Sequence, residues 1–174
     1  MVARVTSSLP PHLAHERYAG LERSDLRRSM GRFVDWATDI RLRRSVMQDC
    51  AFPSDNVIEF LVVNQLAYNG PMRPIELANA LSQTKTNISK VLKRVEDLGL
   101  IDRVPAREDG RGVLVVLTEL GAEMGTRILA RMSRDVDSVF HFWDADDVET
   151  LQRLLARLVR DLESDAAARA RSER

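Results

Sequence analysis

The sequence of 174 residues predicts a mainly α-helical protein with one small β-hairpin. Charged residues make up 30% of the chain and aromatic residues only 5%, a balance that favours helices over a β-sandwich. Apolar residues recur at three- and four-residue steps through most of the chain, as the buried face of an α-helix requires. Residues 101–117 differ, because two short apolar runs there flank a polar loop with glycines, which is typical of a hairpin.

The first periodic region predicts one long amphipathic helix from Ser24, its N-cap, to Gln48. Phe52-Pro53-Ser54 ends this helix, because proline disfavours helical backbone in the residue before it. A second helix is then expected to begin after Ser54 or Asp55 and to run to about Tyr68. Residues 1–23 show no clear period, so an N-terminal tail or arm is expected there.

Two helices joined by a turn are expected between residues 74 and 98. Pro74 suits the first turn of a short helix at Ile75–Leu81. Ser82–Thr84 then form a turn, and Thr84 caps a helix that runs from Lys85 to Leu98. Gly99 stands where a residue in the left-handed conformation commonly ends a helix. A short helix, a tight turn and a second helix predict a helix-turn-helix.

A hairpin and two long helices complete the chain. The strands are expected at Ile101–Val104 and Val113–Leu117. Thr118 should cap a helix that runs to about Phe142, and Asp144 should cap a last helix over about 145–163. The remaining residues, 164–174, are rich in alanine and arginine and are expected to fray.

The helix expected at 85–98 combines an apolar stripe with a polar, basic face. Four basic residues and no acidic one lie between Ser82 and Arg94, although the chain balances 26 basic against 26 acidic residues. Lysine can bond guanine acceptors and asparagine can bond adenine in a major groove wide enough for a helix. Arginines of the hairpin can grip phosphates or enter a narrow minor groove. The expected contacts with DNA are Thr84, Lys85, Thr86, Asn87, Ser89, Lys90, Lys93 and Arg94 on the helix, and Arg103, Arg107 and Arg111 on the hairpin.

These elements and several short motifs resemble the MarR family of winged-helix regulators over roughly residues 25–163. The matching motifs are Glu76-Leu77-Ala78, Leu98-Gly99-Leu100-Ile101, and the run from Arg107 through Asp109 and Arg111 to Leu117-Thr118 and Gly121. The resemblance implies that Arg111 enters the minor groove while Asp109 holds its guanidinium through a charge-assisted pair. Gly110 departs from the family pattern, in which a basic residue is common.

The resemblance further implies a regulator, most commonly a repressor, that binds a palindromic operator in double-stranded DNA as a homodimer. Its fold class is mainly α with a small β-wing: a winged helix-turn-helix plus long N- and C-terminal dimerisation helices. The corresponding division places the helical dimerisation region at 24–53 and 119–163, the winged-helix DNA-binding domain at 54–118, and tails at 1–23 and 164–174. An alternative to the dimer is that the apolar stripes of the terminal helices pack on each other within one chain.

Many members of the family respond to small aromatic or phenolic effectors. The residues that could line such a pocket are Phe33, Trp36, Phe60, Tyr68 and His141. The alternative of ordinary core packing is favoured for each of them, because large apolar residues are usually buried for packing. A redox-sensing regulator that uses Cys50 is an alternative function. A winged helix used only for contact with another protein is a second alternative, which the basic residues of the helix at 85–98 disfavour.

Composition limits other functions. A single cysteine, Cys50, excludes an intramolecular disulfide framework and favours a cytoplasmic location. No apolar stretch approaches the roughly 20 residues that cross a bilayer, and residues 1–11 do not form a signal peptide pattern. No phosphate loop, nucleophile elbow or metal-ligand spacing occurs beyond His12 and His15, so neither an enzyme, a cofactor nor a metal is expected.

Overall fold

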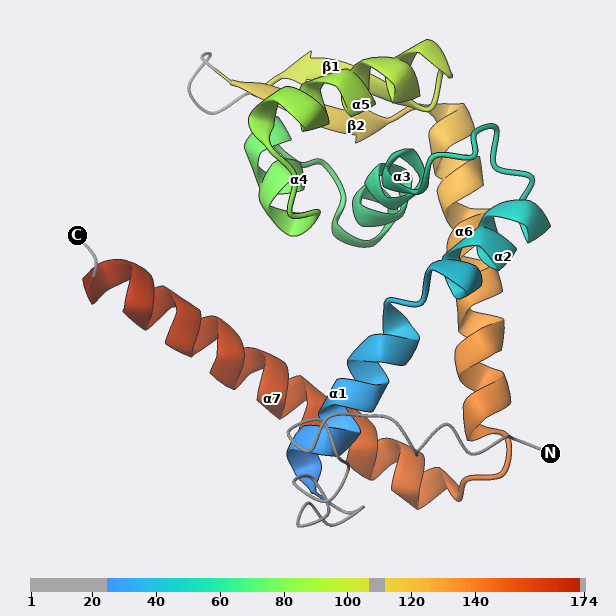
Figure 1. The fold of residues 1–174 in the computed structure, drawn as a ribbon, viewed down its shortest axis with the longest axis vertical. Coiled ribbons are helices and arrows are strands. Elements are labelled where there is room, and N and C mark those ends of the chain that lie inside the picture. The colour runs from blue at the N-terminus through green and yellow to red at the C-terminus, as the bar shows by residue number, and fades with distance from the viewer. Residues whose placement is uncertain (1–24, 107–111, 173–174) are drawn as a thin grey trace, which may run out of the picture.

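The computed structural model of the protein describes residues 25–106 and 112–172 (Figure 1). Within these residues the fold is mainly helical with one two-stranded antiparallel sheet, which confirms the predicted fold class. The elements in chain order are α1 (Leu26–Ala37), α2 (Ile40–Asp49), α3 (Val57–Asn69), α4 (Pro74–Ala80), α5 (Lys85–Asp97), β1 (Ile101–Pro105), β2 (Val113–Leu117), α6 (Glu119–Phe140) and α7 (Ala145–Ser172).

The prediction of one helix from Ser24 to Gln48 is wrong, because two helices, α1 and α2, occupy this region. The chain breaks at Asp39, whose extended backbone and carboxylate provide a new N-cap that accepts the backbone N–H of Arg41 at 2.8 Å. The same carboxylate binds the Arg41 guanidinium, and this bond lowers the pKa of Asp39. An aspartate side chain that bonds nearby backbone competes with helix continuation, which apolar periodicity does not register.

The predicted cap of the next helix is also wrong, since α3 begins after Asn56 rather than after Ser54 or Asp55. The Asn56 Oδ1 atom accepts the backbone N–H of Ile58 at 2.9 Å. The Ser54 hydroxyl instead accepts the N–H of Asn56 itself, at 3.1 Å. The helix ends at Asn69, next to Gly70 with its positive φ of 74°, close to the predicted stop.

The core lies where α3 meets α5, α6 and the sheet. Phe60, Val62 and Val63 of α3 are fully buried there. The sheet pairs Ile101 with Leu117, and a further bridge joins Met72 to Val115. As predicted, Thr118 caps α6, and its hydroxyl accepts the N–H of Gly121 at 3.0 Å. These contacts unite α3, α4, α5, the sheet and the first turns of α6 into one compact winged helix.

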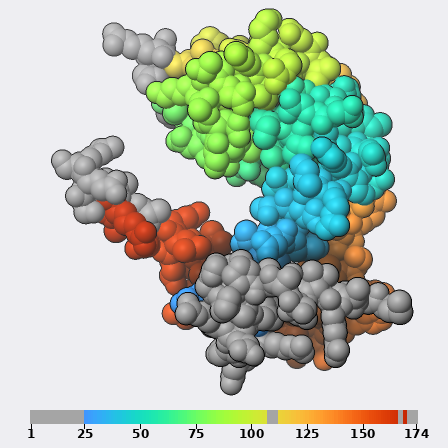
Figure 2. Space-filling view, in the orientation of Figure 1, coloured from blue at the N-terminus to red at the C-terminus, as the bar shows by residue number. Residues whose placement is uncertain are grey.

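The last helix, α7, begins at Ala145 as predicted but continues to Ser172, so the expected fraying after residue 163 is wrong. Alanine has the highest helix propensity, and the Arg169–Asp165 ion pair (2.7 Å) has the one-turn spacing that supports a helix. Figures 1 and 2 show α7 projecting from the body, with open space between it and the winged helix.

Candidate nucleic-acid interface

A tight turn sets α5 across α4. Ser82 adopts a positive φ of 51°, and the backbone N–H of Gln83 bonds the carbonyl of Ala78 at 2.8 Å. Thr84 then caps α5 as predicted, because its hydroxyl accepts the N–H of Asn87 at 3.1 Å. The apolar stripe of α5 is buried against α3 and α4, and only Leu98 at its end is partly exposed. The opposite side of α5 therefore faces outward.

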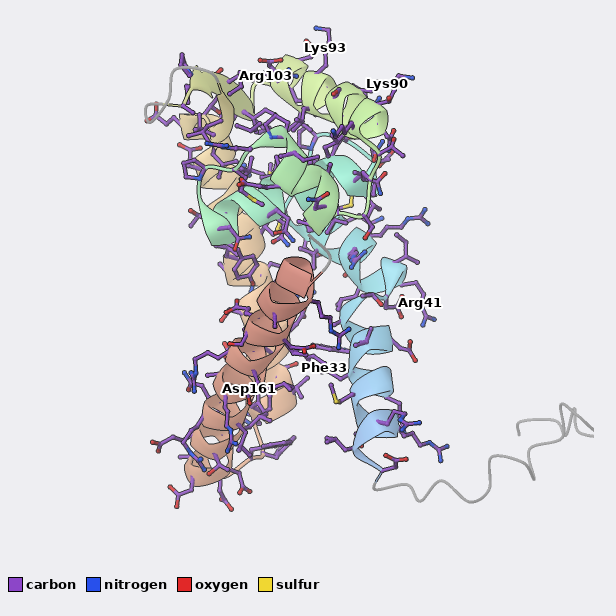
Figure 3. All side chains as sticks on the ribbon, turned by 90° about the vertical axis from the view of Figure 1, so that its left-hand side faces the viewer. Phe33, Arg41, Lys90, Lys93, Arg103 and Asp161 are labelled. Atoms are coloured by element: carbon purple, nitrogen blue, oxygen red, sulfur yellow. The ribbon has the colours of Figure 1, made fainter. Side chains whose placement is uncertain are left out.

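That outward side carries the predicted polar residues. Lys90 and Lys93 point away from the core at one end of the molecule, and Arg103 of β1 lies at the same end (Figure 3). Lys93 contacts Asp97 one turn later at 3.3 Å, a pair between two largely exposed side chains that contributes little stability. The exposed residues of this helix-turn-helix face are Thr84, Lys85, Thr86, Asn87, Ser89, Lys90, Lys93 and Arg94.

Several of these side chains already hold bonds within the chain. The Asn87 amide donates to the Gln83 side-chain carbonyl at 2.6 Å, and the Ser89 hydroxyl donates to the carbonyl of Lys85 at 2.8 Å. Thr84 uses its hydroxyl oxygen as the helix cap. Lys85, Thr86 and Lys90 therefore offer accessible donors on this face, and Lys93 adds one whose exposed pair with Asp97 is weak.

Arg94 is exposed, like the lysines, but it also contacts another helix. Its Nε atom forms an ion pair with the Glu59 carboxylate of α3, and its side chain is 48% exposed. At 3.6 residues per turn, Arg94 lies at the edge between the polar face and the apolar stripe. Glu59 itself was not identified from the sequence, although a lone carboxylate within the apolar run from Val57 to Ala67 marks it as unusual.

The wing is partly outside the described residues. Arg103 lies on β1, where it forms an ion pair with Glu96 of α5 at 3.4 Å. Arg107, Asp109 and Arg111 fall in the segment 107–111, which lies outside the described residues. Their predicted contacts with DNA stay predictions.

The residues predicted to line an effector pocket lie in different environments of the described chain. Phe60 is a core residue that packs edge-on against Phe52, with ring centroids 5.7 Å apart. Phe33 and Trp36 contact each other on exposed α1, at 5.9 Å between centroids. Tyr68 of α3 and His141, which follows α6, are both exposed. A surface hollow at the end of α2 is lined by other residues: Arg44, Met47, Gln48, Ala51, Phe52, Ser54 and Asp55.

Cys50 is a core residue at the end of α2 and is only 5% exposed. Burial raises the pKa of its thiol, the neighbouring Asp49 carboxylate raises it further, and Arg127, Arg131 and Arg134 of α6 offset only part of this rise. A reactive cysteine requires the thiolate, which is favoured by accessible, cationic surroundings. This environment therefore disfavours Cys50 as a redox sensor.

Within the described residues, no helix is long and apolar enough to cross a membrane, and no group of three or more metal-binding side chains occurs.

A helix-turn-helix with a basic outward face, followed by a two-stranded wing, defines a winged-helix DNA-binding protein. Residues 56–112 match the model of the MarR family. The chain is also 32% identical to the multiple antibiotic resistance protein MarR of Salmonella typhimurium over 102 residues, which are 58% of this chain and 71% of that protein. The protein therefore belongs to the MarR family of helix-turn-helix transcriptional regulators.

Solved structures agree with the fold. A MarR family protein from Bacillus stearothermophilus superposes with a TM-score of 0.63 at 20% identity, covering 85% of this chain and 97% of that one. NadR, solved in complex with 4-hydroxyphenylacetate, superposes with a TM-score of 0.57 at 22% identity, covering 74% of this chain and 89% of that one.

Proposed function

We propose that this protein represses transcription by binding a palindromic operator as a homodimer, with α5 in the major groove and the wing over the adjacent minor groove. The observation that carries the proposal is the outward face of α5, where Lys85, Thr86, Lys90 and Lys93 are all exposed. Lys90 and Lys93 lie at one end of the molecule (Figure 3). An α-helix fits the major groove, and lysine can bond guanine or neutralise phosphate there. Arg103 extends the basic surface onto β1. Arg107 and Arg111, which lie outside the described residues, are predicted from the sequence to add to it.

The homodimer is proposed because α1 and α7 leave apolar residues uncovered. Among the residues with a described environment, neither helix contains a buried residue. The alternative of mutual packing within one chain therefore leaves these stripes largely exposed, and a second copy would cover them. The exposed apolar residues are Leu26, Met30, Phe33, Val34 and Trp36 on α1, and Leu154, Leu155, Leu158, Val159 and Leu162 on α7.

The domain division follows from this proposal. Residues 54–118 would form the DNA-binding winged helix, with Asp109 holding Arg111 at the wing. The dimerisation region would comprise 24–53 and the chain from 119 onward, extended past residue 163 by the greater length of α7. A two-fold arrangement of such chains would set two copies of α5 about one DNA turn, roughly 34 Å, apart.

A small aromatic effector is proposed to release the operator. NadR binds 4-hydroxyphenylacetate. In this chain Phe33 and Trp36 present neighbouring rings on α1 that a partner subunit would cover, so dimerisation could complete an apolar wall that is absent from the single chain. The measurement is a titration of phenolic acids into the protein–operator complex. Operator binding that is unchanged by every phenolic acid at millimolar concentration would contradict this part of the proposal.

The central experiment is selection of genomic fragments bound by the full-length chain, followed by footprinting. Two inverted half-sites whose centres lie one helical turn apart are expected, protected by a dimer. Recovery of fragments with no shared sequence, bound no more tightly than a scrambled duplex, would refute sequence-specific regulation. Fragments with a single unrepeated site would instead refute the palindromic dimer alone.

A further inference from the structure

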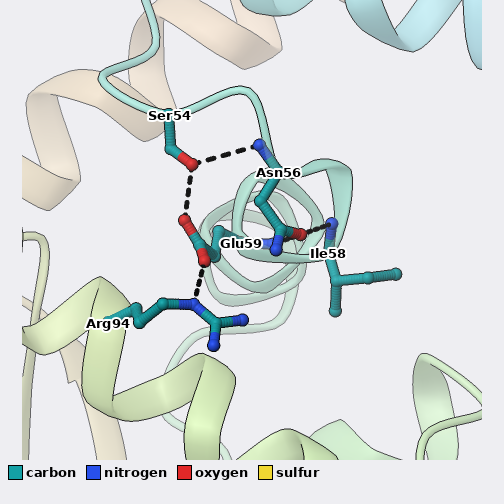
Figure 4. A network of polar contacts seen from close by, with 5 residues as sticks. All are labelled: Ser54, Asn56, Ile58, Glu59 and Arg94. Carbon is teal, nitrogen blue, oxygen red and sulfur yellow. Dashed lines mark hydrogen bonds and ion pairs between the residues drawn. The ribbon is translucent and has the colours of Figure 1, made fainter.

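The N-terminus of α3 contains a carboxylate that is diverted from its usual role. Glu59 occupies the third helical position, from which a glutamate commonly reaches back to the N–H of the cap residue. Here the Ser54 hydroxyl takes the N–H of Asn56 instead (Figure 4). Ser54 also donates to the Glu59 Oε2 atom at 2.5 Å, and Arg94 of α5 binds the Oε1 atom. Each carboxylate oxygen of Glu59 therefore has its own partner.

Burial makes this arrangement hard to release. The Glu59 side chain is only 5% exposed, whereas Arg94 is 48% exposed. A buried carboxylate that loses its cation strongly destabilises the folded protein, because water cannot replace the lost partner. An exposed arginine that leaves its partner is solvated by water, so its own free-energy cost is small. The free-energy cost of breaking the pair therefore falls mainly on Glu59, which favours retention of the pair.

The pair adds a directional restraint to the one that burial of the apolar stripe provides. The stripe of α5 consists of valine, leucine and isoleucine side chains, which set the buried face of the helix through non-directional contacts. Arg94 lies at the edge of the stripe, so a bond between Arg94 and Glu59 narrows the remaining rotation of α5 about its own axis. That rotation determines the angle at which Thr86, Lys90 and Lys93 face outward.

We propose that Glu59 is a positioning residue for DNA recognition: through Arg94 it fixes the rotation of α5, and Arg94 serves this internal role rather than contacting phosphate. The inference rests on the proposed function, because it concerns how α5 presents its face to an operator. It predicts that loss of the pair lowers discrimination between operator and other DNA, with the lysines themselves unchanged.

The test measures dissociation constants of full-length variants for the selected operator and for a scrambled duplex of equal length. Glu59→Gln should lower the operator-to-scrambled affinity ratio about tenfold, which is the scale of losing one charge-assisted bond. The matched control is Asp55→Asn, which removes the same charge from an exposed side chain just before α3 and should leave the ratio unchanged. Because partial unfolding weakens binding to both duplexes alike, a ratio in Glu59→Gln equal to that of Asp55→Asn would overturn the proposal.

Arg94→Gln distinguishes an arginine that positions α5 from an arginine that contacts phosphate. This variant also tests the proposal if Glu59→Gln does not fold. If Arg94 only holds α5 against Glu59, Arg94→Gln should lower the affinity ratio. The salt dependence of binding to the scrambled duplex should then stay unchanged. If Arg94 contacts phosphate, its loss would flatten the slope of log affinity against log salt by about 0.9, and that result would overturn the proposal.

Ser54→Ala, which removes one bond to Glu59 at constant charge, should lower the affinity ratio by a smaller factor. An unchanged ratio in both Arg94→Gln and Ser54→Ala would also overturn the proposal. Absence of sequence preference in the wild type would instead refute the proposed function.

Discussion

Gly121 at the start of α6 lies directly against the carbonyl of Leu100 at the start of the wing. A Cβ atom on Gly121 would stand 1.9 Å from the Leu100 oxygen, which is impossible without movement of the backbone. The Leu100 oxygen also accepts the backbone N–H of Thr118 at 3.1 Å, so it cannot move freely. This close approach joins the base of the wing to α6.

Gly121→Ala should therefore destabilise the protein. Overpacking of a rigid site costs on the order of 1–3 kcal/mol, which thermal unfolding measures as a lower Tm. The control is Gly31→Ala on α1, where an added Cβ meets nothing within 4 Å and alanine favours the helix. Equal stability of Gly121→Ala and the wild type would show that the base of the wing yields without strain.

Lys90→Ala and Lys93→Ala should each weaken operator binding without lowering the Tm, because both side chains are exposed. Each phosphate contact that is lost should reduce the slope of log affinity against log salt by about 0.9. Arg157→Ala provides the control, since it removes one positive charge from an exposed position on α7. Variants with wild-type affinity and slope would exclude the proposed docking of α5.

Leu158→Glu on α7 should convert the dimer to a monomer and abolish tight operator binding, because the charge would interrupt the exposed apolar stripe. Ala156→Glu adds the same charge on the other side of the helix and should leave the dimer intact. Sedimentation equilibrium measures both masses. A dimeric Leu158→Glu protein, or a monomeric wild type, would contradict the proposed interface.

Cys50 should make folding stability fall at alkaline pH. Its thiol pKa is raised in the folded protein, so the unfolded chain loses this proton first. The contribution of Cys50 to folding stability is then fully present below the thiol pKa of the unfolded chain, about 8.5. It is lost as the pH rises through the higher thiol pKa of the folded protein. The stability difference between wild type and Cys50→Ala should shrink above about pH 8.5. Urea unfolding between pH 7 and pH 10 measures it, and a constant difference would place the thiol in contact with water.

Local patterns in the sequence were sufficient for the elements that surround the recognition helix. The Thr84 cap, the Gly99 stop, the two strands and the Thr118 cap all follow from short-range rules, and the structure confirms each of them. These signals suffice because caps and turns are determined by bonds between residues that are neighbours in the chain.

Apolar periodicity predicted less well where a polar side chain competes for the backbone. The stripe continues across residue 39, yet Asp39 ends one helix and caps the next. Asn56, rather than Ser54, caps α3 because Ser54 is engaged with Glu59. Both outcomes depend on which of several polar groups takes a given N–H, and sequence spacing allows more than one answer.

The sequence by itself determined the winged helix and the basic face of α5, because periodicity, capping and charge are properties of consecutive residues. Only the tertiary structure decided that Arg94 pairs with Glu59, 35 positions away in the chain. The tertiary structure also decided that Phe60 is a core residue while Phe33 is exposed. Such pairings depend on how helices cross in space, and a buried carboxylate selects its cation by distance and desolvation rather than by sequence separation.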